Sequence, residues 1–205
     1  MTQFDVLPLF PSVVALGFLE GNTSLSFDRL KKLKYNTLDG GNTKSYSSES
    51  LNVLDQELKL KTLIQNAFTK FKNEVLRLET TEFTITTSWM TMTEPGGYSQ
   101  FHFHKNSYYS AVVYFETHKD GHLIFDDAHS TQQNIQPNDP VEFNLYNLES
   151  FYCTPKENMI VMFPSYLRHK VDTYTGNNNR YSLAVNFFPT GLFGKGDSSL
   201  RIAHA

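Results

Sequence analysis

The stretch Gln100-Phe101-His102-Phe103-His104 leads into an apolar run from Tyr108 to Phe115. In an extended segment side chains alternate between two faces, so the two histidines point one way and the two phenylalanines the other. Two imidazoles on one face of a strand can hold one metal ion. We therefore predict a metal site at this pair, surrounded by β structure.

A third imidazole and a cation follow further along the chain. His169 lies in the segment Phe163 to Val171, where an apolar strand ends in a proline turn and extended structure resumes. Arg180 follows eleven residues later, and alternation places it with Ser182 on one face of the run Arg180 to Phe188. The predicted site thus combines three imidazoles with one inward-facing guanidinium.

The first 80 residues predict an extended arm and helices. Residues 4–19 are interrupted by prolines, which is typical of an edge strand or arm. Ser26 to Leu33 is predicted as a short helix with Ser26 as its cap, and Leu51 to Leu78 as the main helix, because apolar residues recur there at helical spacing. Between them, the polar segment Asn42 to Ser50 predicts an exposed loop.

Beyond residue 80 the pattern becomes that of strands separated by turns. Residues 126–140 predict a long loop, and residues 191–205 a loosely ordered tail. Helices followed by short strands predict a mainly β (α+β) fold, an antiparallel sandwich or barrel with N-terminal helices packed outside. Strands are expected at Phe83–Thr93, Leu123–Phe125, Val141–Tyr152, Met159–Phe163 and Arg180–Phe188, with a turn at Glu94–Gly97 after the first of them.

These elements resemble the 2-oxoglutarate- and iron(II)-dependent oxygenases, and within them a prolyl-hydroxylase-like group. The resemblance spans roughly residues 83 to 190, and its motifs come in the order that the group shows. In this chain they are Trp89, the His102 and His104 step, Ser110 to Tyr114, Phe163 to His169, and Arg180 to Ser182.

The resemblance implies a double-stranded β-helix, or jelly roll, over residues 81–190 of a single domain that spans 1–205. It also implies iron(II) on His102, His104 and His169, with 2-oxoglutarate and O2 as cosubstrates of a hydroxylation. By the same resemblance, Arg180, Ser182 and Tyr114 would bind the remote carboxylate of 2-oxoglutarate, since a guanidinium pairs two oxygens at once. No catalytic residue beyond the metal ligands is expected, and the prime substrate is not implied.

One departure from the family pattern concerns His104, because a carboxylate commonly stands at that position. Iron sites of this kind normally combine two imidazoles with one carboxylate. Either the three histidines form the triad, or a carboxylate arrives from elsewhere. Asp126 and Asp127 are the nearest candidates in the sequence.

Two other functions stay open at this point. One is a cupin-type iron dioxygenase with three histidines and no 2-oxoglutarate, which has no need for Arg180. The other is a non-catalytic jelly-roll protein for binding or structure, which has no need for the His-x-His step.

Composition sets the outer limits. A net charge of −3 and a pI near 6.1 give no clear footprint for nucleic acid. Cys153 is the only cysteine and is expected to be a small buried hydrophobe, so we predict no disulfide and a cytoplasmic protein. No apolar run approaches the length of a membrane span. The sequence leaves open whether the chain forms a homo-oligomer.

The other four histidines are assigned to no site. His118, His122 and His129 fall in or beside predicted turns and loops, and His204 falls in the tail. We expect them to be solvated.

Overall fold

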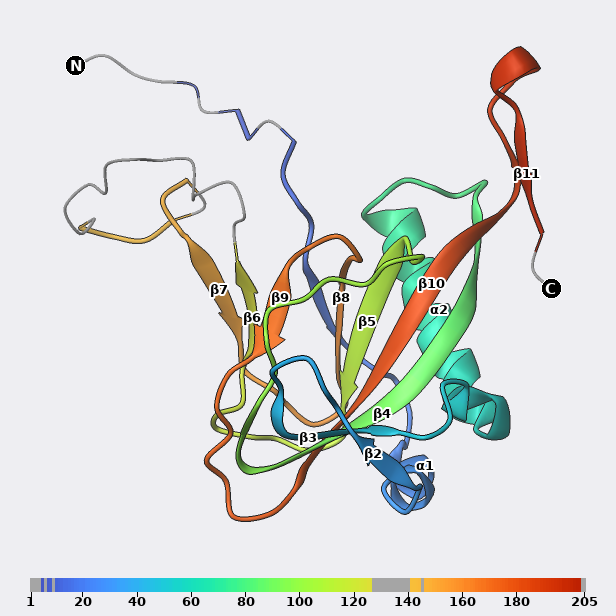
Figure 1. The fold of residues 1–205 in the computed structure, drawn as a ribbon. Coiled ribbons are helices and arrows are strands. Elements are labelled where there is room, and N and C mark those ends of the chain that lie inside the picture. The colour runs from blue at the N-terminus through green and yellow to red at the C-terminus, as the bar shows by residue number, and fades with distance from the viewer. Residues whose placement is uncertain (1–4, 6, 9, 127–140, 145, 204–205) are drawn as a thin grey trace.

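The computed structural model describes residues 5, 7–8, 10–126, 141–144 and 146–203. Two antiparallel sheets lie face to face, and helix α2 covers the outer face of the larger one (Figure 1). Within the described residues, the larger sheet has eight strands in the order β1-β8-β5-β10-β4-β3-β2, with β11 added to β10, and the smaller has three in the order β7-β6-β9. This is the double-stranded β-helix that the sequence predicted.

The elements follow one another as the helices and strands of Figure 1. The N-terminal part contains β1 (Ala15–Phe18), α1 (Ser24–Leu30), β2 (Tyr35–Thr37), β3 (Thr43–Ser48), the 3-10 turn η1 (Val53–Gln56) and α2 (Leu58–Glu74). The remainder contains β4 (Glu82–Tyr98), β5 (Tyr109–Tyr114), β6 (Leu123–Asp126), β7 (Ser150–Cys153), β8 (Met159–Pro164), β9 (His169–Val171), β10 (Arg180–Phe193), η3 (Gly196–Ser198) and β11 (Leu200–Ile202).

Strand β10 organises the larger sheet because it pairs with β4 on one side and β5 on the other. Ser182 lies opposite Thr91 of β4 and opposite Tyr114 of β5. The two faces of β10 have different partners, as alternation predicts. Leu183, Val185 and Phe187 face helix α2, where Phe187 stacks on Phe68 with ring centres 4.0 Å apart. The opposite face, which carries Arg180 and Ser182, turns towards the smaller sheet.

Two apolar cores hold the layers together. The larger one joins α1, α2 and the outer face of the larger sheet, and its centre contains fully buried Ile64, Phe68 and Phe187. The smaller one lies between the two sheets and contains Phe125, Cys153 and Phe163. Cys153 is buried, as predicted, and burial raises the pKa of its thiol to about 11.

The N-terminal segment adds strands to the larger sheet that the sequence did not predict. The polar segment expected as a loop over Asn42 to Ser50 contains β3, so that prediction was wrong. Its serines are buried because their hydroxyls find acceptors and donors there: Ser45 Oγ donates to the Tyr98 carbonyl (3.1 Å), and Ser48 Oγ accepts from Met90 N (3.0 Å). The edge strand expected within residues 4–19 is β1, which pairs with β8 at the sheet edge.

Both helices start at other residues than predicted. Helix α1 begins at Ser24, so Ser26 is a buried residue inside it and not its cap. The main helix begins at Leu58 because the chain leaves helical geometry at Glu57, with φ −123° and ψ 56°. The Glu57 carboxylate there accepts from Arg29 Nε (2.5 Å) and Nη2 (2.6 Å), which ties this break to α1. Helix α2 ends at Glu74, four residues before the predicted end.

The predicted turn at Glu94 to Gly97 is a bulge inside strand β4. The register passes from Ser45 opposite Thr93 to Thr43 opposite Tyr98, so the glycine-rich segment is extra chain opposite Lys44. A Cβ on Gly97 would lie 2.7 Å from the Lys44 carbonyl oxygen. Glycine is therefore needed for close approach of two backbones, and not for a chain reversal.

The C-terminal third differs from the prediction at two places. The strand predicted over Val141 to Tyr152 is confined to β7, and most of the predicted loop 126–140 lies outside the described residues. The tail from Gly191 is more ordered than predicted, because β10 continues to Phe193 and β11 pairs with it through Gly191, Leu192 and Phe193. This hairpin projects from the body of the molecule (Figure 1). The division into 1–80, 81–190 and 191–205 stays a prediction.

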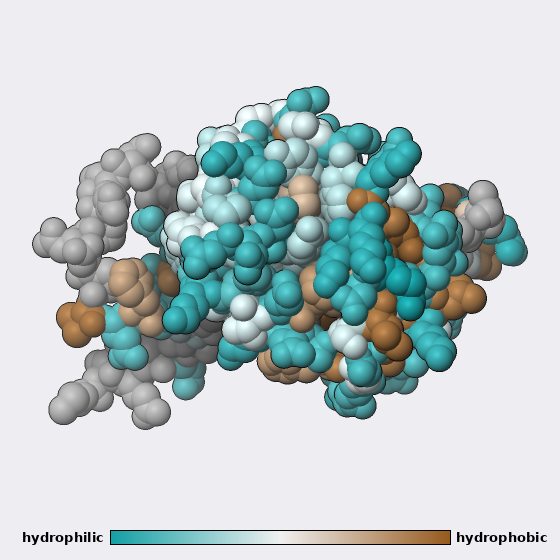
Figure 2. Space-filling view, turned by 90° about the horizontal axis from the view of Figure 1, so that it is seen from below, coloured by the Kyte–Doolittle hydropathy of each residue, from teal (hydrophilic) through white to brown (hydrophobic). Residues whose placement is uncertain are grey.

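The surface seen from below is mainly hydrophilic, with hydrophobic side chains in separate patches (Figure 2). Neither described helix combines the length and the apolar character that a membrane crossing requires.

Candidate metal and cosubstrate site

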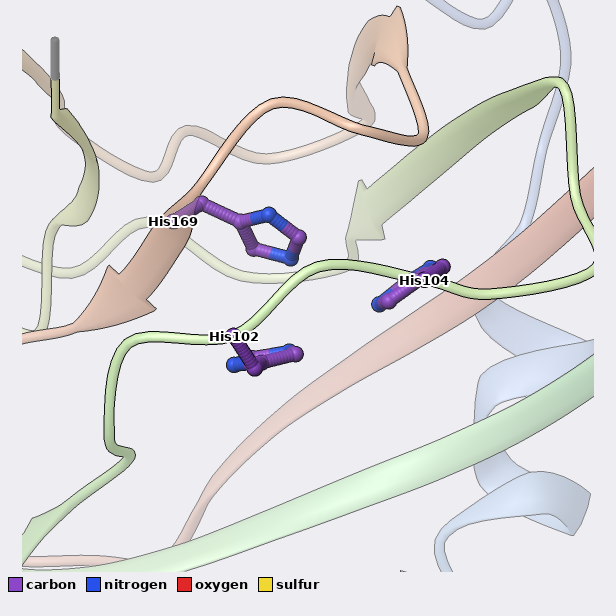
Figure 3. Close-up of side chains that lie close together, drawn as sticks. All are labelled: His102, His104 and His169. Carbon is purple, nitrogen blue, oxygen red and sulfur yellow. The ribbon is translucent and has the colours of Figure 1, made fainter. Parts of the chain in front are cut away.

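The three predicted histidines converge at one end of the smaller sheet (Figure 3). Their ligand atoms all lie within 4.8 Å of one another. The ring centre of His169 lies 4.4 Å from that of His102 and 5.0 Å from that of His104. Three imidazoles that come from two distant segments of the chain thus share one small volume, which fits a single metal ion.

Backbone hydrogen bonds fix the two segments against each other. His102 and His169 form a two-way antiparallel bridge, in which each backbone N–H donates to the carbonyl of the other at 2.9 Å. His104 N donates to the Ser165 carbonyl, also at 2.9 Å. The His-x-His segment is therefore not part of a long strand, but it is held extended beside β9, and its two rings share a face as alternation predicted.

The outer nitrogens of His102 and His169 contact nearby backbone. His102 Nδ1 lies 2.8 Å from the Gln100 carbonyl, and His169 Nδ1 lies 2.8 Å from the Leu167 carbonyl. A carbonyl oxygen only accepts, so each Nδ1 carries the proton and each Nε2 keeps its lone pair. Each acceptor stands two residues before its histidine, so the local chain already sets these two tautomers.

Burial keeps two of the three rings neutral. It lowers the pKa of His169 to about 3, helped by the neighbouring His102 and His104, while the hydrogen bond to Leu167 acts in the opposite direction. Burial likewise lowers the pKa of His104 to about 4, against the hydrogen bond to Asn186. Neutral imidazole is the form that binds metal, so neither ring has to lose a proton first near neutral pH.

Arg180 and Tyr114 are completely buried side by side, with the guanidinium carbon 5.2 Å from the ring centre. Nε and both Nη atoms of Arg180 and the hydroxyl of Tyr114 have no hydrogen-bond partner within the described part of the chain. An unpaired buried cation costs free energy unless an anion reaches it. The pair therefore fits a carboxylate guest, which would accept from the guanidinium and from the phenol.

A cleft of about 660 Å³ connects this pair to the histidines. Tyr114 and Ser182 line it together with all three rings, and Trp89 lies beside His104 with ring centres 5.4 Å apart. Burial raises the pKa of Tyr114 to about 12, although Arg180 lowers it, so its hydroxyl stays a hydrogen-bond donor. All six predicted site residues thus lie at or beside one cleft.

Asp126, the alternative carboxylate, is not part of the histidine group. Its side chain forms an ion pair with Arg168, with Oδ2 3.4 Å from Nη1. Asp127 lies outside the described residues. Among the residues that are described, the candidate metal group consists of histidine alone.

The remaining histidines are less exposed than predicted. The His118 ring packs edge-on against Tyr174, and burial lowers its pKa. The expectation of a solvated side chain was wrong for His118, and Nδ1 of His122 is buried as well. His129 and His204 lie outside the described residues.

Sequence reasoning missed the polar residues around His104. Its Nδ1 lies 2.8 Å from Asn186 Oδ1 and 2.9 Å from Ser110 Oγ. Asn186 stands on the Arg180 face of β10, two alternations beyond Ser182, so the period of the strand would have found it. No local pattern indicates which histidine it meets, because 82 positions separate the two residues.

Comparison with known proteins gives a consistent result. A family model described as "Putative 2OG-Fe(II) oxygenase" matches residues 87–186. No curated protein matches the chain.

Solved structures with the same fold are listed here as the nearest in architecture and not in sequence. They include HygX from Streptomyces hygroscopicus with nickel, 2-oxoglutarate and hygromycin B bound, at TM-score 0.59 and 11% identity, over 87% of this chain and 84% of that one. A Pseudomonas putida prolyl-4-hydroxylase matches at TM-score 0.55 and 17% identity, over 86% and 92%. A Trichoplax adhaerens prolyl hydroxylase, solved with a hypoxia inducible factor peptide, matches at TM-score 0.58 and 10% identity, over 85% and 83%.

Proposed function

We propose that this chain, which belongs to the 2-oxoglutarate- and iron(II)-dependent oxygenases, holds its iron on His102, His104 and His169 and hydroxylates a substrate that is still to be identified. The observation that carries the metal assignment is the convergence of three ring nitrogens within 4.8 Å. Iron(II) and 2-oxoglutarate are the cofactors of this class, and together with O2 they supply oxidation of an unactivated C–H bond.

The chain's own contribution at the metal is a preset group of neutral donors. His102 and His169 have their Nδ1 protons bound to backbone carbonyls, which leaves both Nε2 lone pairs free. Burial of His104 and His169 keeps protons away from these rings. Three uncharged ligands leave the charge of the metal uncompensated, and we infer that the dicarboxylate cosubstrate supplies the balancing charge.

Arg180, Tyr114 and Ser182 supply the cosubstrate end of the site in this proposal. Four unpaired donor atoms of Arg180 and Tyr114 are buried in the protein interior, which supports binding of a carboxylate between them. Ser182 stands directly opposite Tyr114 in the sheet register and adds a hydroxyl on the same side. Because the surroundings exclude water, a guanidinium–carboxylate pair is stronger here than on the surface.

The cleft beyond the rings is open to a second molecule. Trp89 and Phe101 give its walls flat apolar surface, and Thr91 and Ser47 add hydroxyl groups. We infer that the substrate enters from this side and presents a C–H bond close to the three histidines. Its chemical identity does not follow from these contacts.

Anaerobic titration tests the proposal directly. Iron(II) and 2-oxoglutarate are added to the protein without oxygen, and the weak visible charge-transfer band of the chelate is recorded. We expect the band in the parent protein and its loss in His169→Ala. A parent protein that binds iron but shows no band with saturating 2-oxoglutarate would contradict the cosubstrate assignment.

The two alternatives from the sequence are decided by the family assignment. A non-catalytic jelly roll and a three-histidine dioxygenase without cosubstrate both leave the family match unexplained. The second also gives no reason for a fully buried, unpaired guanidinium beside the cleft.

A further inference from the structure

The side chain of Asn186 makes three contacts at the back of the proposed metal site, away from the other two histidines. It is 92% buried, by virtue of an exposed fraction of 8%. Its Oδ1 lies 2.8 Å from His104 Nδ1 and 2.8 Å from Ser110 Oγ, and its Nδ2 donates to Thr87 Oγ1 at 3.0 Å. Both ends of the amide are thus occupied, by residues from three different strands or loops.

The orientation of this amide decides where the proton of His104 lies. With Nδ2 directed at Thr87, the atom facing His104 is an amide oxygen, which has no proton to give. His104 Nδ1 must therefore be the donor, and Nε2 is left with its lone pair. A reversed amide would impose the opposite tautomer and place a proton where the metal has to bind.

His104 depends on distant side chains for this, unlike its two partners. The acceptors for His102 and His169 are backbone carbonyls two residues away, which no substitution removes. The acceptor for His104 comes from β10, 82 positions along the chain. Because His104 also stands where related sites have a carboxylate, its orientation needs support that a carboxylate at this position would not require.

A chain of serines supports the acceptor in turn. Ser110 Oγ contacts Ser165 Oγ at 2.8 Å, and Ser165 Oγ donates to Ser107 Oγ at 2.8 Å. The Ser165 carbonyl also accepts from His104 N. The serine of the Phe-Pro-Ser segment therefore holds both the backbone of His104 and the network at its ring.

We propose that Asn186 is a positioning residue that sets the tautomer and the ring orientation of His104, so that Nε2 faces the metal. This inference rests on the proposed function for its consequence, but the tautomer itself is a property of the metal-free protein. Residues that orient a ligand in this way typically change metal affinity about 10- to 100-fold when removed.

The first experiment measures the tautomer without metal. Protein labelled with 15N-histidine and treated with EDTA is observed by long-range 1H–15N correlation at pH 7.5, and His104→Gln identifies the His104 signals by their loss. We expect Nδ1 protonated and Nε2 bare in the parent. In Asn186→Leu, which cannot accept, the signals should move towards the Nε2–H form. In Asn186→Asp, which can accept, they should keep the parent pattern.

The second experiment measures affinity for cobalt(II) alone, from its visible absorption spectrum. Asn186→Leu should bind about 10- to 100-fold more weakly, and Asn186→Asp should bind at least as tightly as the parent. Thr91→Val is the matched control, since Thr91 lines the same cleft on the same strand as Thr87, and it should bind like the parent.

Three results would overturn the proposal: a parent His104 with its proton on Nε2, an Asn186→Leu protein with unchanged tautomer, or an Asn186→Asp protein with the tautomer of Asn186→Leu. If Asn186→Leu fails to fold, the parent and Asn186→Asp spectra still decide. If the parent shows the expected tautomer but binds no cobalt, the proposed function fails and the tautomer assignment stands.

Discussion

The guanidinium carbon of Arg180 lies 5.2 Å from the ring centre of Tyr114, and neither side chain has any exposed surface. Their polar atoms form no hydrogen bond within the described residues. A buried cation held in this state is unfavourable unless an anion joins it. Two predictions follow from this pair alone, one for the bound and one for the free protein.

Arg180→Ala should leave iron(II) binding intact and weaken 2-oxoglutarate. Loss of one partner of a buried charge pair typically costs ~3 to 5 kcal/mol, which is roughly two to three and a half decades in affinity at ~1.4 kcal/mol per decade. Arg180→Lys should recover only part of this, because an ammonium lacks the two-pronged geometry. Calorimetric titration into manganese-loaded variants measures it. Parent-like affinity in Arg180→Ala would make Arg180 a structural residue.

The protein without cosubstrate should respond in the opposite direction. Arg180→Met keeps most of the apolar volume and removes the unpaired donors, so we expect the free energy of unfolding to rise, by about 1 to 3 kcal/mol. Urea unfolding of the metal-free proteins measures the change. Added 2-oxoglutarate and manganese should stabilise the parent more than the variant. A large loss of stability in Arg180→Met would show that the guanidinium has a partner in solution.

His102→Ala and His169→Ala should each sharply reduce iron content after anaerobic reconstitution, because each removes one of three converging ring nitrogens. His122→Ala is the control, since this partly buried histidine does not belong to the group. It should retain the parent's iron content. Full occupancy in His169→Ala would rule out the proposed site.

Changing the third ligand tests whether a carboxylate is required. His104→Asp converts the set to two imidazoles and one carboxylate, and iron should still bind. Asp126→Ala should leave iron binding nearly unchanged, because that carboxylate is engaged with Arg168. Iron content and the cobalt spectrum report both results. Loss of iron in Asp126→Ala would mean that this aspartate, and not His104, completes the triad.

The metal-free protein should lose stability in acid. The pKa of His104 falls from 6.5 in the unfolded chain to about 4 in the fold, and that of His169 from 6.5 to about 3. Below pH 6.5 the unfolded state binds protons that the folded state refuses, so the free energy of unfolding falls as the pH falls. Each ring contributes at most ~1.4 kcal/mol per pH unit down to its folded pKa.

Urea titrations in EDTA between pH 7.5 and 4.5 would measure this loss. His169→Gln removes one of the two groups, so its stability should depend less steeply on pH than that of the parent. Equal slopes in the two proteins would contradict the assignment of the effect to this ring.

Much of the site could be predicted from short segments. His102 and His104 share a side because side chains alternate along extended chain, and the same rule places Arg180, Ser182 and Asn186 on one face of β10. The turn prediction at Glu94 to Gly97 failed for a related reason. Glycine signals unusual backbone geometry, but whether that geometry reverses the chain or forms a bulge depends on the strand beside it, here at Lys44.

The sequence by itself determined which residues face which way, because the period of a strand is fixed by covalent geometry. It also determined the tautomers of His102 and His169, whose acceptors are two residues away. Only the tertiary structure decided that His169 meets His102, that polar β3 joins a sheet, and that Asn186 meets His104. Those contacts join residues far apart in the chain, and a strand's hydrogen-bonding edge can accept many partners, so the choice among them is made by the packing of the whole fold.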